Sequence, residues 1–225
     1  MTLVVLACLG LGLGSDPRSV AIPTPDGGAV HADRFGSGEH CVVLVHGARF
    51  DKGSWEEQAR ALTEAGLCAL AIDLRGYGQS IGGSRSSVSE DGYPIDVLAA
   101  VRYLRDGGAT AVSIVGGSLG GWAAAQAAVA AKPGEIDRLV LLAASPIEHP
   151  ERMHAGRILF VTARDDRRGG GVGVPRLPEI RDQLERAPDP KELLVVEGSA
   201  HAQHLFGTAA GGLLLGEIVR FLTGP

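Results

Sequence analysis

Residues 112–121 read VSIVGGSLGG, a β-branched run that ends in the pattern Gly-x-Ser-x-Gly around Ser118. An alanine-rich stretch that favours a helix, 119–131, follows directly. The order of strand, Gly-x-Ser-x-Gly and helix predicts a sharp turn that exposes a serine hydroxyl at the edge of a sheet, with small residues on either side to allow close packing. We expect Ser118 to be a nucleophile. The alternative is an ordinary strand-to-helix turn in a glycine-rich chain.

Short apolar runs alternate with helical stretches along the rest of the chain. Continuous apolar runs are typical of strands buried on both faces. Their alternation with helices predicts a three-layer α/β fold, an eight-stranded and mostly parallel sheet with helices on both faces. The expected strands are 20–23 and 29–35, which form an antiparallel hairpin, and then 42–45, 68–72, 112–115, 139–143, 158–161 and 193–196. The expected helices are 54–65, where 54–57 (SWEE) fits a capping box, and then 94–105, 119–131, 177–186 and 212–222.

A serine nucleophile needs a base and an orienting acid, and both residue types follow late strands. His201 lies on the loop after the last predicted strand, and His204, three residues on, is the competing base. Asp165 and Asp166 both follow the preceding strand, and only one of them can face the imidazole. The order serine, aspartate, histidine is known for one sheet topology of serine hydrolases.

Two backbone amides are expected to stabilise a developing oxyanion. The amide of Leu119 lies at the start of a helix, where backbone N–H groups are free. The second donor is the amide of Ala48, just after the strand that ends at His46. His46 itself is expected to be a hydrogen-bonded packing residue without a role in proton transfer. Arg49 either points into the pocket or, as we expect, is exposed on its loop.

Three motifs together resemble the α/β-hydrolase family. His46-Gly47 is similar to the family's oxyanion strand end, residues 73–80 (DLRGYGQS) to its Asp-x-x-Gly-x-Gly-x-Ser turn, and Ser118 to its nucleophile elbow. The resemblance runs from about Ser19 to the C-terminus, which implies a single hydrolase domain over 19–225. It favours Asp166 as the acid, with Asp165 as the alternative because Ala163 replaces the family's glycine.

Finer features of the resemblance concern the pocket. Residues 46–50 (HGARF), with Ser54-Trp55, are similar to small abhydrolase-domain proteins of the CoA-linked deacylase kind. Many family members carry a helical cap where this chain has only residues 144–157, so no cap domain is expected. The arrangement resembles cap-less carboxylesterases, acyl-protein thioesterases and dienelactone-hydrolase-like enzymes. Arg164, Arg167 and Arg168 either favour an anionic substrate or form a solvated rim.

The resemblance implies a serine hydrolase that cleaves an ester or thioester of a small-molecule or acylated substrate through an acyl-enzyme. One alternative is acyl transfer to a thiol or amine acceptor. The other is a non-catalytic binding protein on a hydrolase scaffold, because fold does not imply function. The chain has no Cys-x-x-Cys and no clustered His/Cys spacing, so no metal or other cofactor is expected.

Charge and the N-terminus limit the partners and the location. The net charge is −5 and no long basic run exists, so nucleic acid is not an expected partner. The apolar stretch 3–13 is too short to span a bilayer. Residues 1–18 are either an apolar arm or the remnant of a signal in which 5–8 (VLAC) is a lipoprotein cleavage box and Cys8 carries the lipid. The protein is accordingly expected in the cytoplasm or exported.

Cys41 and Cys68 bear on the same question. Each lies five residues before the residue that follows its predicted strand, His46 and Asp73 respectively. If these parallel strands are neighbours, the two thiols lie close enough for a disulfide, which fits an oxidising compartment. The alternative is a pair of small buried thiols.

Overall fold

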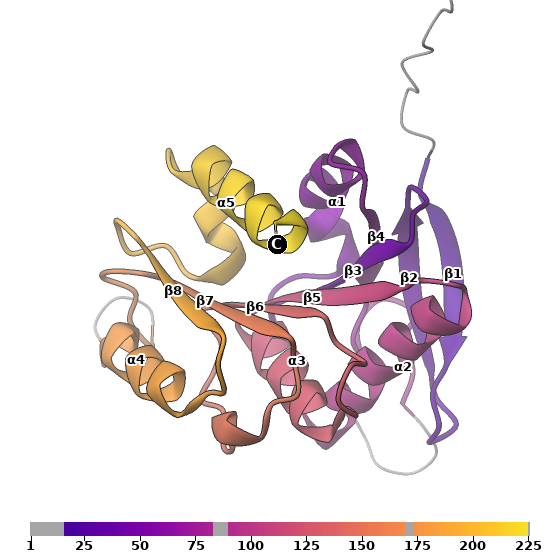
Figure 1. Ribbon diagram of the computed structural model, residues 1–225, viewed down its shortest axis with the longest axis horizontal. Helices are drawn as coiled ribbons and strands as arrows, with labels where there is room; N and C mark the ends of the chain where they lie inside the picture. The colour runs from indigo at the N-terminus through magenta and orange to yellow at the C-terminus, as the bar shows by residue number, and fades with distance from the viewer. Residues whose placement is uncertain (1–15, 83–89, 170–172, 225) are drawn as a thin grey trace, which may run out of the picture.

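A computed structural model describes residues 16–82, 90–169 and 173–224. These form an eight-stranded sheet in the order β1-β2-β4-β3-β5-β6-β7-β8 (Figure 1). β1 pairs antiparallel with β2 and β2 with β4, and the other neighbouring strands are parallel. The predicted α/β sheet with its leading hairpin is therefore confirmed. The strands are β1 Arg18–Pro23, β2 Ala29–Phe35, β3 His40–Val45, β4 Cys68–Ile72, β5 Ala111–Gly117, β6 Arg138–Leu142, β7 Arg157–Ala163 and β8 Lys191–Val196.

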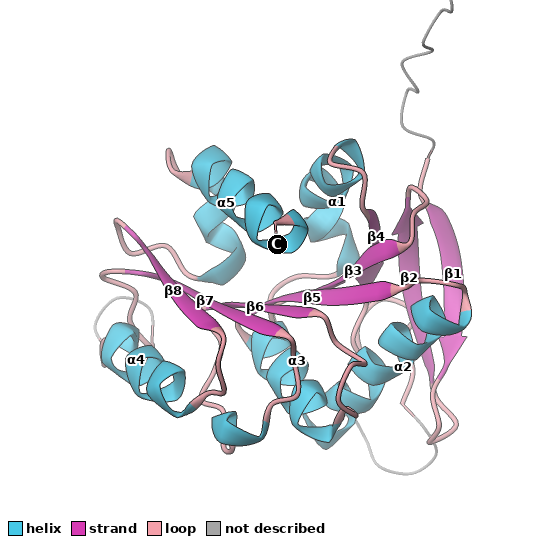
Figure 2. Ribbon diagram, viewed as in Figure 1, coloured by secondary structure: helices cyan, strands magenta, loops and turns pink. Residues whose placement is uncertain are grey.

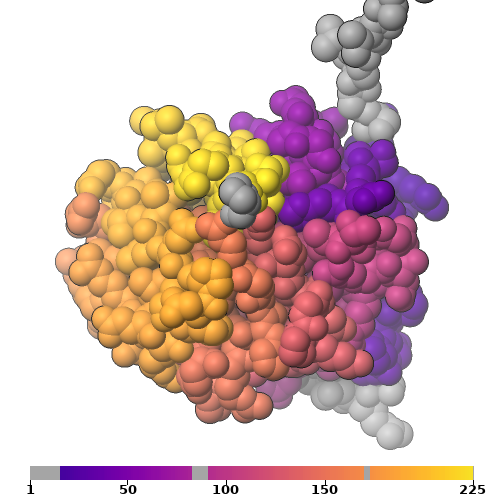
Figure 3. All heavy atoms as spheres, in the orientation of Figure 1, coloured from indigo at the N-terminus to yellow at the C-terminus, as the bar shows by residue number. Residues whose placement is uncertain are grey.

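Helices cover both faces of this sheet. Helices α1 (Glu56–Glu64) and α5 (Gly211–Thr223) pack on one face, and α2 (Tyr93–Asp106), α3 (Leu119–Ala130) and α4 (Arg176–Arg186) pack on the other (Figure 2). Successive strand residues point to opposite faces, so Leu44 joins the apolar layer under α1 and α5 while Val43 joins the layer under α2 and α3. Figure 3 shows α1 and α5 side by side on their face of the molecule.

The start of α1 differs from the predicted capping box. Asp51 caps a short 3₁₀ turn, η1 (Lys52–Trp55), by accepting a hydrogen bond from the Gly53 amide, and the α-helix begins at Glu56. Ser54 donates instead to the Asp51 carbonyl. The prediction was wrong because a second capping residue lies three positions upstream and satisfies the first free amide.

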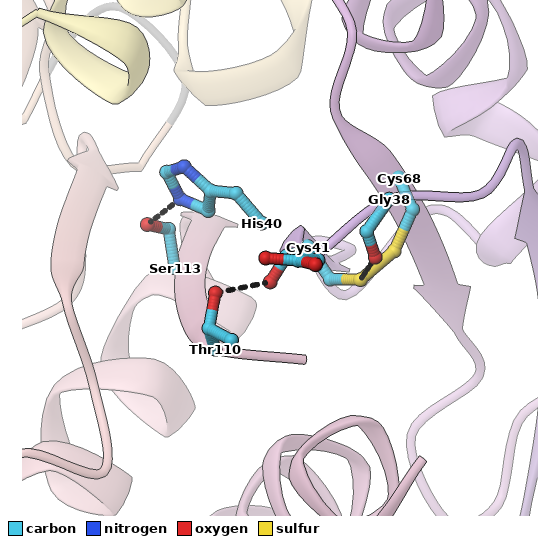
Figure 4. Close-up of a disulfide and its surroundings, with 7 residues drawn as sticks. Gly38, His40, Cys41, Cys68, Thr110 and Ser113 are labelled. Carbon is cyan, nitrogen blue, oxygen red and sulfur yellow. Dashed lines mark hydrogen bonds between the residues drawn. A yellow bond between two sulfur atoms is a disulfide. The ribbon is translucent and has the colours of Figure 1, made fainter. Parts of the chain in front are cut away.

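The disulfide between Cys41 and Cys68 is present (Figure 4). The two residues are directly paired across the parallel strands β3 and β4, with Cα atoms 4.4 Å apart, and both side chains are fully buried. Next to it, His40 hydrogen-bonds the buried Ser113 hydroxyl at 2.9 Å, which gives that polar group inside β5 a partner.

The connection from β6 to β7 holds no cap. It contains one short 3₁₀ turn, η3 (Pro150–Arg152), within residues that are all described. The proposed apolar arm, the lipoprotein box and Cys8 lie outside the described residues, and the division at residue 18 stays a prediction. No helix in the described part of the chain is long and apolar enough to cross a membrane.

Candidate active site

Ser118 lies at the turn between β5 and α3. Its backbone has φ 52° and ψ −113°, a conformation that non-glycine residues rarely adopt. The turn is tight enough that a Cβ atom on Gly120 would lie 2.3 Å from the Val45 carbonyl oxygen. Glycine at this position therefore permits the close packing of α3 against β3, and the serine side chain is left half-buried at the carboxyl end of the sheet.

A continuous chain of hydrogen bonds joins Ser118, His201 and Asp166. Ser118 Oγ lies 2.8 Å from His201 Nε2, and His201 Nδ1 lies 2.7 Å from Asp166 Oδ2. An ionised carboxylate only accepts hydrogen bonds, so Nδ1 carries the proton and Nε2 is free to accept the serine hydroxyl. Asp166 is only 2% exposed, which keeps water from competing for its oxygens.

The residues that the sequence left as alternatives differ in their contacts. Asp166, and not Asp165, contacts the imidazole; Asp165 is exposed. His204 is exposed and stacks against Phe50 with ring centroids 5.1 Å apart. It makes no hydrogen bond to Ser118, whereas His201 does.

Of the two amides expected to bind an oxyanion, one follows Ser118 in the chain and the other belongs to a residue that lines the same cavity. Leu119 is the first residue of α3, and Ala48 lies on the loop after β3. Neither amide donates a hydrogen bond to another described residue, so both remain available to a substrate oxygen. Free amides at a helix N-terminus also carry a partial positive charge.

Gln203 holds the loop that carries Ala48, and sequence reasoning missed it. Its Oε1 accepts a hydrogen bond from the Gly47 amide at 2.7 Å, and its Nε2 donates to Ser54 Oγ at 2.7 Å. The side chain is buried, so it connects the loop after β8 with the loop after β3. No local pattern could have found it, because 156 residues separate it from Gly47.

A cavity of about 820 Å³ lies over these groups. Sequence reasoning predicted that three arginines lie near the acid, but of these Arg167 alone lines the cavity. Arg164 pairs with Glu197 and Arg168 with Glu179. Arg49 lines the cavity while being exposed, and Arg176 lines it without having been anticipated. The described residues contain no cluster of three or more His, Cys, Asp or Glu side chains that could hold a metal ion.

A model of the alpha/beta hydrolase family matches residues 42–217. The chain belongs to the alpha/beta hydrolase family. The match includes the turn at Ser118, the amides of Ala48 and Leu119, and His201.

Known proteins resemble the chain to different extents. A non-heme chloroperoxidase of Kitasatospora aureofaciens is 31% identical over 125 residues, which are 55% of this chain and 43% of that protein. The chain thus spans less than half of that curated relative. Among solved structures, an esterase from Pyrococcus furiosus superposes with a TM-score of 0.74 at 18% identity, over 92% of each chain. A serine hydrolase without a lid from Xanthomonas campestris gives 0.72 at 18% identity, over 94% of this chain and 97% of that one.

His46 belongs to the scaffold of this alpha/beta hydrolase, as predicted. Its Nε2 accepts a hydrogen bond from the Leu74 amide at 3.2 Å, and its Nδ1 lies 2.9 Å from the Gly47 carbonyl. Burial lowers the pKa of His46, which keeps the ring neutral and able to accept that amide. The residue therefore ties the turn after β4 to the loop that carries Gly47 and Ala48.

Proposed function

We propose that this protein is a serine hydrolase that cleaves a carboxylic ester or thioester through an acyl-enzyme. The observation that carries the proposal is the unbroken hydrogen-bond chain from Ser118 through His201 to the buried Asp166. Ser118 and Ala48 line the same cavity, and the amides of Ala48 and of Leu119, which follows Ser118 in the chain, donate no hydrogen bond to a described residue. Family membership and the fold shared with esterases support a hydrolytic enzyme.

In the first half-reaction, Ser118 Oγ attacks the carbonyl carbon and passes its proton to His201 Nε2. The carbonyl oxygen becomes an oxyanion that accepts hydrogen bonds from the amides of Leu119 and Ala48. The bond from carbon to the leaving oxygen or sulfur then breaks, and His201 returns the proton to the leaving group. The product that remains is an ester of Ser118.

In the second half-reaction, water replaces the leaving group. His201 takes a proton from the water while the water oxygen attacks the acyl carbon. The bond from that carbon to Ser118 Oγ then breaks, and His201 returns the proton to Oγ, which releases the acid and restores the serine. Asp166 keeps the imidazole in the required tautomer and stabilises the imidazolium formed in each step. The β6–β7 connection, which is described throughout, contains no cap domain, so the proposal accommodates bulky acyl groups.

The first test is intact mass after exposure to a fluorophosphonate, combined with hydrolysis of p-nitrophenyl esters of increasing chain length. We expect one phosphonyl adduct on the wild-type protein and none on Ser118→Ala. Because removal of a member of such a triad costs about 10⁴-fold or more in kcat, Ser118→Ala and His201→Ala should both lose turnover to that extent.

A serine outside the cavity gives the matched control. Ser19→Ala, on the exposed first strand, should keep both adduct and turnover. An unlabelled wild-type protein without esterase turnover would overturn the proposal in favour of a binding role. Turnover that requires an added thiol or amine would instead identify an acyltransferase.

A further inference from the structure

Three guanidinium groups line the cavity that holds Ser118 and His201. They come from separate loops: Arg49 follows β3, Arg167 follows β7, and Arg176 begins α4. The protein as a whole carries a net charge of −5. A cavity wall with three positively charged side chains is therefore opposite in sign to the net charge of the protein.

Arg176 is the most deeply placed of the three. Its side chain is 14% exposed, and its Nε is buried without a hydrogen-bond partner among the described residues. Nε lies 3.5 Å from Asp166 Oδ2, an oxygen that already accepts from His201. Burial lowers the pKa of Arg176 and Asp166 raises it, but a guanidinium stays charged at neutral pH. Apart from this ion pair, the Arg176 side chain makes no hydrogen bond to a described residue, so an anion in the cavity that it lines would meet guanidinium donors that no hydrogen bond uses.

The other two cavity arginines form no ion pair with a described residue. Arg49 forms no hydrogen bond with a described side chain, and among the described residues the Arg167 guanidinium donates only to the Gly173 carbonyl. By contrast, Arg164 and Arg168 on the same loop each pair with a glutamate. The loop thus directs its paired arginines away from the cavity and leaves an unpaired one on its wall.

The carboxylates on the same wall offset only part of this positive charge. Asp166 is hydrogen-bonded to His201 and forms an ion pair with Arg176 alone among the three arginines. Asp165 is exposed and forms no ion pair with Arg49, Arg167 or Arg176 in the described part of the chain. The wall therefore retains positive charge that is available to a substrate.

We propose that the substrate carries a carboxylate next to its scissile ester, bound by Arg176 with help from Arg49 and Arg167. This inference rests on the proposed hydrolase function and names its substrate class: half-esters of dicarboxylic acids, in place of simple fatty esters. A planar carboxylate matches the fork of N–H donors on a guanidinium, which a neutral acyl chain cannot use.

The test compares two ethyl esters of nearly equal shape. Ethyl hydrogen glutarate carries a carboxylate three methylenes from the ester, and ethyl 5-methylhexanoate carries an isopropyl group in its place. Acid release gives kcat/KM for each ester, and the ratio of the two values is the readout. Arg176 also contacts Asp166, so its replacement can lower activity toward every ester. Such a general loss lowers both values of kcat/KM equally and cancels in their ratio.

We expect the wild-type protein to prefer the glutarate ester by tenfold or more. Arg176→Gln should reduce that preference by about tenfold, as expected for the loss of a charge-assisted hydrogen bond, and Arg176→Lys should restore part of it. Arg49→Gln, on an exposed loop, should reduce it by roughly two- to fivefold. Arg220→Gln on α5, an exposed arginine paired with Glu217, is the control that should leave the ratio unchanged.

Different results overturn different claims. If the wild-type protein hydrolyses both esters equally, or if its preference survives in both Arg176→Gln and Arg49→Gln, the carboxylate site is wrong and the hydrolase proposal stands. If neither ester is hydrolysed and fluorophosphonate does not label Ser118, the hydrolase proposal itself fails, and the carboxylate site fails with it. Arg49→Gln keeps the test decisive if the Arg176 variants do not fold.

Discussion

The strained backbone of Ser118 is maintained by its neighbours. A residue at φ 52° costs free energy, and it persists only where the surroundings over-determine it. Here the Ser118 amide donates to the Leu142 carbonyl at 2.8 Å, and Gly120 packs against the end of β3. The turn is therefore stabilised by contacts from both flanking strands, which hold the serine hydroxyl toward His201.

The loop that carries Ala48 depends in the same way on a single buried side chain. Gln203→Ala would leave the buried Gly47 amide without an acceptor, at a cost of about 1–3 kcal/mol, and would free the loop to move. We expect kcat to fall by roughly ten- to a hundredfold. This decrease is no larger than the decrease in kcat that follows the removal of an oxyanion-hole donor. Ester hydrolysis and urea denaturation of the variant measure the two effects.

Glu is the informative replacement at this position. Gln203→Glu cannot donate to Ser54, but it keeps the oxygen that accepts from the Gly47 amide. Because that acceptor remains, Gln203→Glu should recover most of the kcat that Gln203→Ala loses. If Gln203→Ala retained wild-type kcat, the hydrogen bonds of Gln203 would have no part in positioning the Ala48 amide.

The turn after β4 connects elements that are far apart in the chain. Arg75 is buried and forms hydrogen bonds with Asp96 on α2 through its amide, Nε and Nη2, and its Nη1 donates to Asp26 in the β1–β2 turn. Asp73 in the same turn accepts from the amide and the ammonium of Lys52. The turn residues of the family motif therefore join the hairpin, α2 and η1 around the sheet edge.

This network predicts an acid-sensitive contribution to stability. Hydrogen bonds from Arg75 and Thr24 lower the pKa of Asp26 from its ordinary 3.8 to about 2. A lowered carboxyl pKa adds stability that is complete above about pH 4 and is lost as the pH falls toward 2. We expect Asp26→Asn to reduce the free energy of unfolding by about 1 kcal/mol at pH 6, after allowance for partial exposure. The difference from wild type should shrink between pH 4 and pH 2.

Urea denaturation across that pH range measures the difference. Asp182→Asn on α4, where the carboxylate is 67% exposed, is the control and should show a small difference at every pH. A gap between wild type and Asp26→Asn that stays constant down to pH 2 would show that Asp26 contributes no charge-dependent stability.

A disulfide links two neighbouring strands inside the sheet. The Cys41–Cys68 disulfide joins β3 and β4 across a separation of 27 residues, so it restricts a long stretch of the unfolded chain. In the loop-entropy description, a link of this length stabilises a protein by about 3 kcal/mol. It is also typical of proteins that fold in an oxidising compartment.

Reduction should therefore destabilise the protein without changing its fold. We expect dithiothreitol to lower the free energy of unfolding of the wild type by about 3 kcal/mol in equilibrium urea denaturation. Cys41→Ala/Cys68→Ala, which has no disulfide, should show no response to the reductant. An unchanged wild-type midpoint, with both thiols shown to be reduced by titration, would contradict the expectation.

Most of the sheet could be predicted because its signals are local. Runs such as 68–72 are apolar without interruption, so they must be buried on both faces, and β4 has the bounds that were predicted. The start of α1 was mispredicted because two adjacent segments, Asp51 and 54–57, carry capping signals and local preference cannot rank them. The turn at Ser118 was predictable because its glycines and its flanking strand and helix lie within ten residues.

The amino-acid sequence by itself determined the α/β class, the serine turn and the order of Ser118, aspartate and His201. These follow from hydrophobic periodicity and turn chemistry, which act over a few residues. Only the tertiary structure paired Cys41 with Cys68, placed Asp166 and not Asp165 against His201, brought Gln203 to Gly47 and placed Arg176 on the cavity wall. Those contacts depend on strand register and on the path of loops between distant elements, which no short stretch of chain specifies.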